Sequence, residues 1–298
     1  MQNSLLYIVT VLIWGSTWLA IKFQLGVVDP ALSVAYRFFL AAALLFIYSR
    51  AQKLELRFGW RAHAFMALQG LLLFSINYVM VYFAEETITS GLVAVIFSSM
   101  IVLNVFFGAL FLRRPIRPRV LLGATVGIGG LVLIFLPELV GFDLSSGRAL
   151  GLALAVMSSI SASLGNIVSA RNQEHELPVI QTNAYGMAYG AVLTSLIAIG
   201  RGAELAFDPS FAYVASLLYL ALFGSVIAFG SYLTLLGRIG ADRAAYIMII
   251  FPVIALLLSA MFEGLAMDAQ QLIGVALILA GNAIVLTRRK RAIAGKPA

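Results

Sequence analysis

Hydrophobic residues in this chain run in long continuous stretches instead of alternating with polar residues. A helix needs roughly 20 apolar residues to cross the hydrocarbon core of a bilayer, whereas strands of a membrane barrel alternate over about ten residues. The pattern therefore predicts an all-α polytopic membrane protein. Its ten expected transmembrane helices cover residues roughly 4–23, 31–49, 62–84, 88–112, 118–136, 149–170, 179–200, 211–236, 242–262 and 269–287.

The sequence also contains an internal repeat. When it is shifted by 151 positions, residues 87–135 align with residues 238–286 without a gap. Identical matched pairs include Val102/Val253, Gly123/Gly274 and Gly130/Gly281. Each copy belongs to a block with an odd number of expected helices, so the two blocks have opposite orientations, as in many secondary transporters. We expect a first five-helix repeat at 1–137, an inverted second repeat at 148–288 and a basic cytoplasmic tail at 289–298.

Composition and charge support a membrane location. Hydrophobic residues make up 62% of the chain and charged residues 11%, with a net charge of +7. If the N-terminus is cytoplasmic, the expected inner loops hold 16 of the 20 basic residues and four of the 13 acidic ones. This asymmetry follows the positive-inside rule, so the basicity needs no nucleic-acid partner. We expect a multi-pass protein of the bacterial inner membrane with both termini cytoplasmic, whose partners are the lipid bilayer and a small-molecule substrate. The sequence leaves the oligomeric state open, and a monomer is compatible with it.

Residues for catalysis or metal binding are scarce. The chain has no cysteine and two histidines, His63 and His175, both expected at helix ends in basic loops. It has no G-x-S-x-G motif and no paired carboxylates within an expected span. We therefore predict that the protein is not an enzyme and uses no metal or cofactor. A membrane receptor or scaffold stays open as the non-transport alternative.

Several short motifs carry a resemblance to a known family. They are Gly240-Ala-Asp-Arg-Ala-Ala, Phe251-Pro-Val-Ile-Ala, Phe262-Glu-Gly, Trp14-Gly-Ser-Thr-Trp18 and Arg37-Phe38. With them, the chain resembles the ten-helix EamA-repeat transporters of the drug/metabolite transporter superfamily, and within these it looks most like inner-membrane aromatic amino-acid exporters. The resemblance implies two inverted five-helix repeats around a central cavity. The sequence departs from the family where Ile101 and Leu112 occupy the first-repeat positions of Pro252 and Glu263.

Aromatic residues spaced four apart indicate a binding cavity. Three such pairs project two rings each from one helix face: Trp14 and Trp18, Tyr78 and Tyr82, Tyr185 and Tyr189. A hydroxyl or indole N–H deep in a span needs a partner that lipid does not offer. A cavity for flat or cationic organic solutes is one explanation, and hydrogen bonds between packed helices are the other. The other polar candidates for the cavity are Asn77, Ser99, Ser163, Asn166, Tyr232 and Tyr246.

Charged residues within the expected spans are few. Arg37 lies well inside one, and Lys22 follows Trp18 by four positions on the same helix face. Either could bind a substrate carboxylate, and arginine suits that planar group bidentately, although both could instead reach the outer interface. The carboxylates Glu85, Glu86 and Glu263 all fall at outer helix ends. Because proton-coupled exporters generally need a buried carboxylate, we expect facilitated transport or exchange.

Together these features predict a secondary transporter, an exporter or facilitator of small amphipathic organic solutes. Aromatic or other amino acids and related metabolites are the expected substrates, moved by alternating access. A cationic drug or metabolite exporter with proton coupling is the alternative. Pro252 interrupts the hydrogen bonding of its helix and is the expected hinge.

Overall fold

Every segment of regular structure in the described part of the chain is helical. The computed structural model describes residues 2–113, 115–116, 118–140, 147–232 and 247–286. The helices are α1 (Gln2–Lys22), α2 (Pro30–Ala51), α3 (Trp60–Gln69), η1 (Gly70–Ile76), α4 (Asn77–Glu85), α5 (Ser90–Ser98), α6 (Met100–Leu112), α7 (Pro118–Val140), α8 (Gly147–Glu174), α9 (Val179–Gly200), α10 (Phe211–Tyr219), η2 (Leu220–Ile227), α13 (Ile247–Phe262) and α14 (Ala269–Leu286). The predicted all-α class is confirmed.

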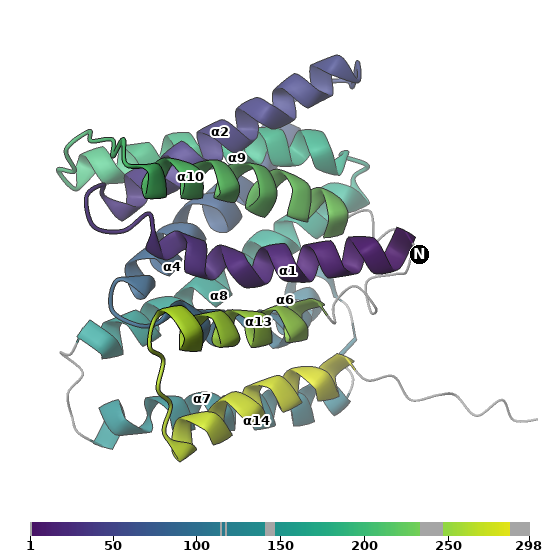
Figure 1. Cartoon of the computed structure of the whole chain (residues 1–298). Helices are drawn as coiled ribbons and strands as arrows, with labels where there is room; N and C mark the ends of the chain where they lie inside the picture. The colour runs from purple at the N-terminus through teal and green to yellow at the C-terminus, as the bar shows by residue number, and fades with distance from the viewer. Residues whose placement is uncertain (1, 114, 117, 141–146, 233–246, 287–298) are drawn as a thin grey trace, which may run out of the picture.

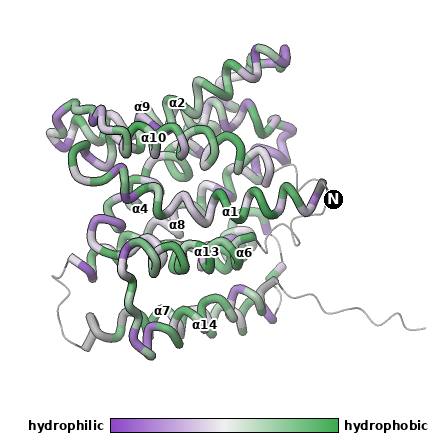
Figure 2. Tube along the Cα trace, in the orientation of Figure 1, coloured by the Kyte–Doolittle hydropathy of each residue, from purple (hydrophilic) through white to green (hydrophobic). Residues whose placement is uncertain are grey.

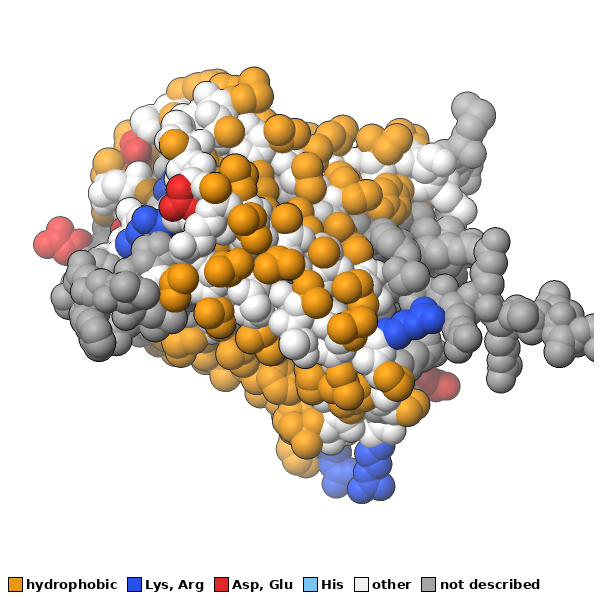
Figure 3. Space-filling model, turned by 90° about the horizontal axis from the view of Figure 1, so that it is seen from below, with side chains coloured by type: hydrophobic (Ala, Val, Ile, Leu, Met, Phe, Trp, Pro, Cys, Tyr) orange, Lys and Arg blue, Asp and Glu red, His pale blue; other side chains and the backbone are white. Residues whose placement is uncertain are grey.

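The helices are long and apolar enough for a bilayer. Six continuous segments among the described residues meet the length and composition of a membrane span: Asn3–Lys22, Pro30–Ala51, Trp60–Glu85, Ser90–Leu112, Gly147–Glu174 and Phe211–Tyr232. α7, α13 and α14 add further apolar helices. Hydrophobic residues fill the middle of the helices, with hydrophilic residues mostly toward their ends (Figure 2). On the face seen in Figure 3, hydrophobic side chains cover the centre and charged side chains lie toward the margins. The protein is therefore a polytopic membrane protein.

The two ends of the bundle differ in charge. The start of α1 and the end of α14 lie at the same end (Figure 1), which we call the basic end because it carries Arg50, Arg57, Arg61 and Arg171. The opposite end, which we call the acidic end, carries Asp29, Glu85, Glu86, Glu204, Asp208, Glu263 and Asp268. There, desolvation and the nearby carboxylate of Asp29 raise the pKa of Glu86 above its ordinary value.

A close contact between α7 and α14 reflects the internal repeat. A Cβ atom on Gly130 would lie 2.5 Å from the carbonyl oxygen of Gly274, and one on Gly281 would lie 2.5 Å from that of Gly123. Glycine is thus required at both points for the helices to approach. In the repeat, Gly123 matches Gly274 and Gly130 matches Gly281. Each of the two α7 glycines therefore contacts the α14 glycine that matches the other α7 glycine. The two helices run antiparallel, which is the reciprocal arrangement that an inverted duplication produces.

Two π-helical segments, η1 and η2, occupy matching positions in the repeats. Shifting η1 by 151 residues places it on 221–227, and η2 covers Leu220–Ile227. Each interrupts a continuous span, between α3 and α4 in the first repeat and after α10 in the second. π-Helical segments change the i→i−4 bonding locally and are frequent at functional sites. Both lie next to the cavity described below.

Candidate functional site

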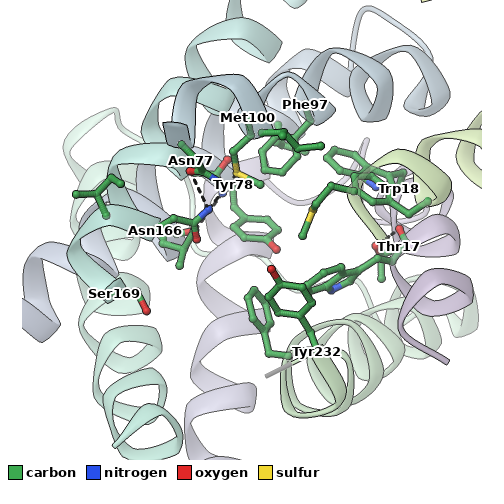
Figure 4. Close-up of a pocket in the computed structure, with 18 of the residues that line it drawn as sticks. Thr17, Trp18, Asn77, Tyr78, Phe97, Met100, Asn166, Ser169 and Tyr232 are labelled. Atoms are coloured by element: carbon green, nitrogen blue, oxygen red, sulfur yellow. Dashed lines mark hydrogen bonds between the residues drawn. The ribbon is translucent and has the colours of Figure 1, made fainter. Parts of the chain in front are cut away.

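A cavity of about 410 Å³ lies among the helices of both repeats. Its lining comes from α1, α2, η1, α4, α5, α6, α8, α13 and the residues that follow η2 (Figure 4). Toward the acidic end, the lining residues Ile21 and Val81 are buried, with 2% and 1% of their surface exposed. Toward the basic end, the lining residue Gln173 near the end of α8 is exposed. As far as the described residues go, the cavity is therefore open at the basic end.

Aromatic rings form much of the cavity wall. Trp18 of α1 stacks on Phe251 of α13, with ring centroids 5.9 Å apart and planes 6° from parallel. Its other neighbour is Phe97, which it meets edge-on at 5.2 Å. Trp14, one helical turn earlier, contacts Tyr232 at 5.2 Å. These rings give a ligand apolar faces for stacking, together with hydroxyl and indole groups for orientation.

Arg37 of α2 places a positive charge in the cavity wall. Only 1% of its surface is exposed, and its Nε donates a hydrogen bond to Ser225 Oγ in η2 at 3.2 Å. The guanidinium lies over the ring of Tyr78, 4.6 Å from the centroid, and 5.3 Å from that of Phe38. Its Nη1 is buried and has no hydrogen-bond partner among the described residues. A buried cation with a free donor is costly unless an anion meets it.

Asn77 presents a complementary acceptor in the same cavity. It is the first residue of α4, directly after η1, and its Nδ2 donates to the carbonyl oxygen of Leu73 at 3.1 Å. The side chain is 1% exposed, and its Oδ1 has no partner in the described part of the chain. Next to it, the ring of Tyr78 points toward that of Tyr232 across the cavity (Figure 4). Among the described lining residues, Arg37 Nη1 and Asn77 Oδ1 are thus a buried donor and a buried acceptor without a partner.

A group of amides lies closer to the basic end. Asn166 Nδ2 donates to Asn104 Oδ1 at 3.5 Å and contacts Met100 Sδ at 3.2 Å (Figure 4). Ser163 is buried outside the lining, and its hydroxyl donates to Asn104 Oδ1 at 2.7 Å. Ser163 therefore orients Asn104, and Asn104 and Asn166 face the cavity.

The structure places some of the residues that the sequence singled out in the cavity lining and others outside it. Seven of them line the cavity: Trp14, Trp18, Arg37, Asn77, Tyr78, Asn166 and Tyr232. Five described ones do not: Tyr82, Ser99, Ser163, Tyr185 and Tyr189. Tyr246 lies outside the described residues. Lys22 is also absent from the lining, because its ammonium group donates to the carbonyl oxygens of Glu85 and Ile88.

Tyr185 and Tyr189 contact other helices instead of the cavity. The Tyr185 hydroxyl donates to the carbonyl oxygen of Leu56 at 2.8 Å, and that of Tyr189 shares a 2.9 Å hydrogen bond with His63 Nδ1. The ring of His63 packs edge-on against Tyr185 at 4.8 Å. These contacts match the alternative that deep hydroxyls join packed helices. They also place His63 within α3 and not in a solvated loop.

Other lining residues were missed by sequence reasoning. Phe97, Phe229 and Phe251 are single phenylalanines within apolar runs, so no spacing distinguished them. Asn104 did carry a usable signal, because an amide inside an otherwise apolar run needs a partner.

A bundle of membrane-spanning helices around a cavity that is open at one end is the architecture of a membrane transport protein. The comparison with protein families agrees with this class. The EamA-like transporter family matches the chain twice, over residues 3–136 and 149–287, and the chain belongs to that family. The resemblance to the EamA-repeat transporters found in the sequence motifs is confirmed.

Relatives with similar sequences are also named as transporters. The uncharacterized inner membrane transporter YedA of Escherichia coli (strain K12) is 31% identical over 253 residues, which are 83% of this chain and 78% of YedA. The probable amino-acid metabolite efflux pump of the same organism is 24% identical over 289 residues, covering 94% of this chain and 93% of the pump. A solved crystal structure covers 95% of the chain and 96% of its own, with a TM-score of 0.66 and 20% identity, which shows the shared fold.

Proposed function

We propose that this transporter moves amino acids, aromatic ones in particular, across the inner membrane by alternating access. The observation that supports this most strongly is the presence of an unpaired donor, Arg37 Nη1, and an unpaired acceptor, Asn77 Oδ1, in the same cavity. Both atoms are buried and unpartnered among the described residues, and both side chains line one cavity. The E. coli relatives named as an inner membrane transporter and an amino-acid metabolite efflux pump fit the same proposal.

The two polar groups suit the two charges of an amino acid. A carboxylate accepts hydrogen bonds from a guanidinium, bidentately where geometry allows, and such charged bonds are stronger than neutral ones. An ammonium group donates to an amide oxygen such as Asn77 Oδ1. An aromatic side chain then lies against the rings of Trp18, Phe97 and Tyr232 that share the lining.

The direction of opening fits loading from the cytoplasm. By the positive-inside rule, the basic end faces the cytoplasm. The described residues leave the cavity open at that end, which supports an inward-facing arrangement in which a cytoplasmic solute enters. Export then requires the acidic end to open while the basic end closes.

Counterflow in proteoliposomes tests the substrate class. The vesicles are loaded with an unlabelled aromatic amino acid, and uptake of labelled solutes is followed for the amino acid, its amide and its decarboxylated amine. We expect strong counterflow of the amino acid alone, because only it offers both a carboxylate and an ammonium group. Protein-free vesicles give the background. If the amine or a quaternary cation is exchanged as well as the amino acid, the protein is a cation exporter and the proposal is wrong.

Replacing Pro252 with alanine is expected to slow transport by about tenfold while leaving substrate affinity unchanged. Pro252 lies inside α13, directly after the lining residue Phe251, and proline has no N–H for the carbonyl four residues earlier, that of Met248. Restoring that hydrogen bond stiffens a helix that forms part of the cavity wall. Stopped-flow counterflow measures the rate, and equilibrium binding measures the affinity. Leu257→Ala, on the exposed side of the same helix, is the matched control. An unchanged transport rate in Pro252→Ala would show that Pro252 is not a hinge.

A further inference from the structure

Two amide side chains on neighbouring helices form a second polar surface in the cavity, and we call them the amide pair. They are Asn104 of α6 and Asn166 of α8, which both line the cavity and are both half-buried. The hydroxyl of Ser163 donates to Asn104 Oδ1 at 2.7 Å, and Asn166 Nδ2 donates to the same oxygen at 3.5 Å. Because Ser163 is fully buried behind the lining, it fixes the orientation of the Asn104 amide.

The amide pair keeps one donor group and one acceptor group free. An amide oxygen has two lone pairs, and Ser163 and Asn166 together use both of those on Asn104 Oδ1. Asn104 Nδ2 and Asn166 Oδ1 have no hydrogen-bond partner among the described residues. The pair thus offers the cavity an N–H group and a carbonyl oxygen, which match a ligand group that both accepts and donates.

The surroundings of the amide pair are polar but uncharged. Ser169 and Gln173 follow Asn166 by three and seven positions, so they lie on the same face of α8, and both line the cavity. At 1.5 Å per residue, this polar face extends roughly 10 Å toward the basic end. Arg37 is the only charged residue in the described lining. The carboxylate of Glu85, which its position at a helix end had suggested to be exposed, is covered by neighbouring helices and lies outside the lining. A neutral ligand group therefore suits this part of the cavity.

The amide pair adjoins Asn77, the proposed acceptor for the ammonium group of the substrate. Gly165, the residue before Asn166, packs against Leu73, where an added Cβ atom would lie 2.7 Å from the Leu73 Cβ. The carbonyl oxygen of Leu73 in turn accepts the hydrogen bond of Asn77. Asn77 and Asn166 lie on one side of the cavity, and Trp18 lies on the other (Figure 4). A substrate whose ring lies against Trp18 therefore presents its amino nitrogen, and any group attached to that nitrogen, to the amide pair.

We propose that the amide pair is a second subsite, which binds the peptide group of a dipeptide whose C-terminal residue is aromatic. This inference rests on the proposed function, in which Arg37 binds the carboxylate and the aromatic wall binds the side chain. The peptide carbonyl oxygen accepts from Asn104 Nδ2, and the peptide N–H donates to Asn166 Oδ1. The N-terminal residue then lies along the polar face of α8 toward the basic end. The cavity volume of about 410 Å³ is within the range of pockets that bind drug-sized ligands, to which a dipeptide belongs.

Isothermal titration calorimetry of the purified protein in detergent tests this subsite. Phenylalanine, alanyl-phenylalanine and phenylalanyl-alanine are titrated separately. We expect alanyl-phenylalanine to bind about tenfold more tightly than phenylalanine, because the peptide group adds two neutral hydrogen bonds. Phenylalanyl-alanine has the same composition, but its ring belongs to the N-terminal residue, so it should show no such gain.

Variants of the amide pair show where the gain comes from. Asn104→Leu removes the amide at similar size and should lower the ratio of the two affinities, dipeptide over amino acid, by about tenfold. Ser163→Ala is a smaller change that releases the Asn104 amide, and it should lower the same ratio by about threefold even if Asn104→Leu does not fold. Leu110→Ala, on the exposed side of α6, is the matched control and should leave the ratio unchanged.

The outcomes separate the subsite from the proposed function. Binding of phenylalanine without a gain for alanyl-phenylalanine overturns the subsite and leaves the amino-acid proposal standing. An equal gain for phenylalanyl-alanine, or a gain that persists in both variants, overturns the subsite as well. Binding of alanyl-phenylalanine alone supports the subsite and rejects the free amino acid as the substrate. If none of the three ligands binds, the proposed function is wrong and the subsite with it.

Discussion

Replacing Arg37 with glutamine is expected to weaken binding of an aromatic amino acid by about ten- to a hundredfold. This range corresponds to the roughly 1.5–3 kcal/mol that a hydrogen bond to a charged group contributes. Glutamine keeps a donor of similar reach and can still bond to Ser225, but it lacks the charge that faces the carboxylate. Arg37→Lys should weaken binding of the amino acid nearly as much as Arg37→Gln does. An ammonium group cannot bond to Ser225 and to a carboxylate in the planar geometry of a guanidinium.

Equilibrium binding and counterflow measure this effect, each with the amino acid and its amide. The variant should lose its preference for the amino acid and bind the amide about as well as the wild-type protein does. Arg201→Gln is the matched control, since Arg201 is exposed at the acidic end and its guanidinium stacks on Phe83, 4.5 Å from the ring centroid. Thermal unfolding shows whether each variant is folded. A folded Arg37→Gln protein that still prefers the amino acid tenfold would falsify the carboxylate role.

The length of the apolar stretches and the charge of the loops between them were sufficient to predict the class of fold. A span needs a fixed number of apolar residues whatever its neighbours, and loop charge reports orientation without any knowledge of packing. The π-helical segments could not be predicted, because hydrophobic periodicity is uninformative in helices that are apolar on every side. Only their matching positions in the repeat, visible once the structure is known, show that they are a shared feature.

The candidate site was predicted in part for a related reason. A spacing of four places two rings on one helix face but does not say which neighbour that face meets. Trp14 and Trp18 meet the cavity, whereas Tyr185 and Tyr189 meet α3 and the segment before it. Glu85 shows the same limit for charge, because a helix end that is exposed in one bundle is covered by neighbouring helices in another.

Symmetry of the scaffold does not extend to the polar groups of the cavity. The repeat matches Tyr78 with Phe229, and both rings line the cavity. It matches Asn77 with Ala228, which offers no side-chain acceptor. A duplicated framework thus supplies aromatic walls from both halves and the unpaired amide acceptor from one half only. For the amino-acid substrate proposed above, this difference predicts a single orientation in the cavity.

Replacing Gly130 with alanine is expected to destabilise the protein by about 1–3 kcal/mol, the usual cost of overpacking a close contact. The added Cβ would lie 2.5 Å from the carbonyl oxygen of Gly274 and 2.9 Å from the backbone nitrogen of Ile278. Because the nearest atom is backbone, relief requires α7 and α14 to separate along their contact. The midpoint of unfolding in a detergent titration measures the loss.

Gly129→Ala is the matched control for this substitution. It adds the same methyl group to the same helix, one residue away, where nothing lies within 4 Å of the new atom. Since alanine favours helix over glycine by up to about 1 kcal/mol, this variant should be as stable as the wild type or more so. Gly281→Ala should cost about as much as Gly130→Ala, because its Cβ would lie 2.5 Å from the carbonyl oxygen of Gly123. A loss at Gly130 without one at Gly281 contradicts a reciprocal contact between the repeats, since a two-fold relation requires matched positions to respond alike.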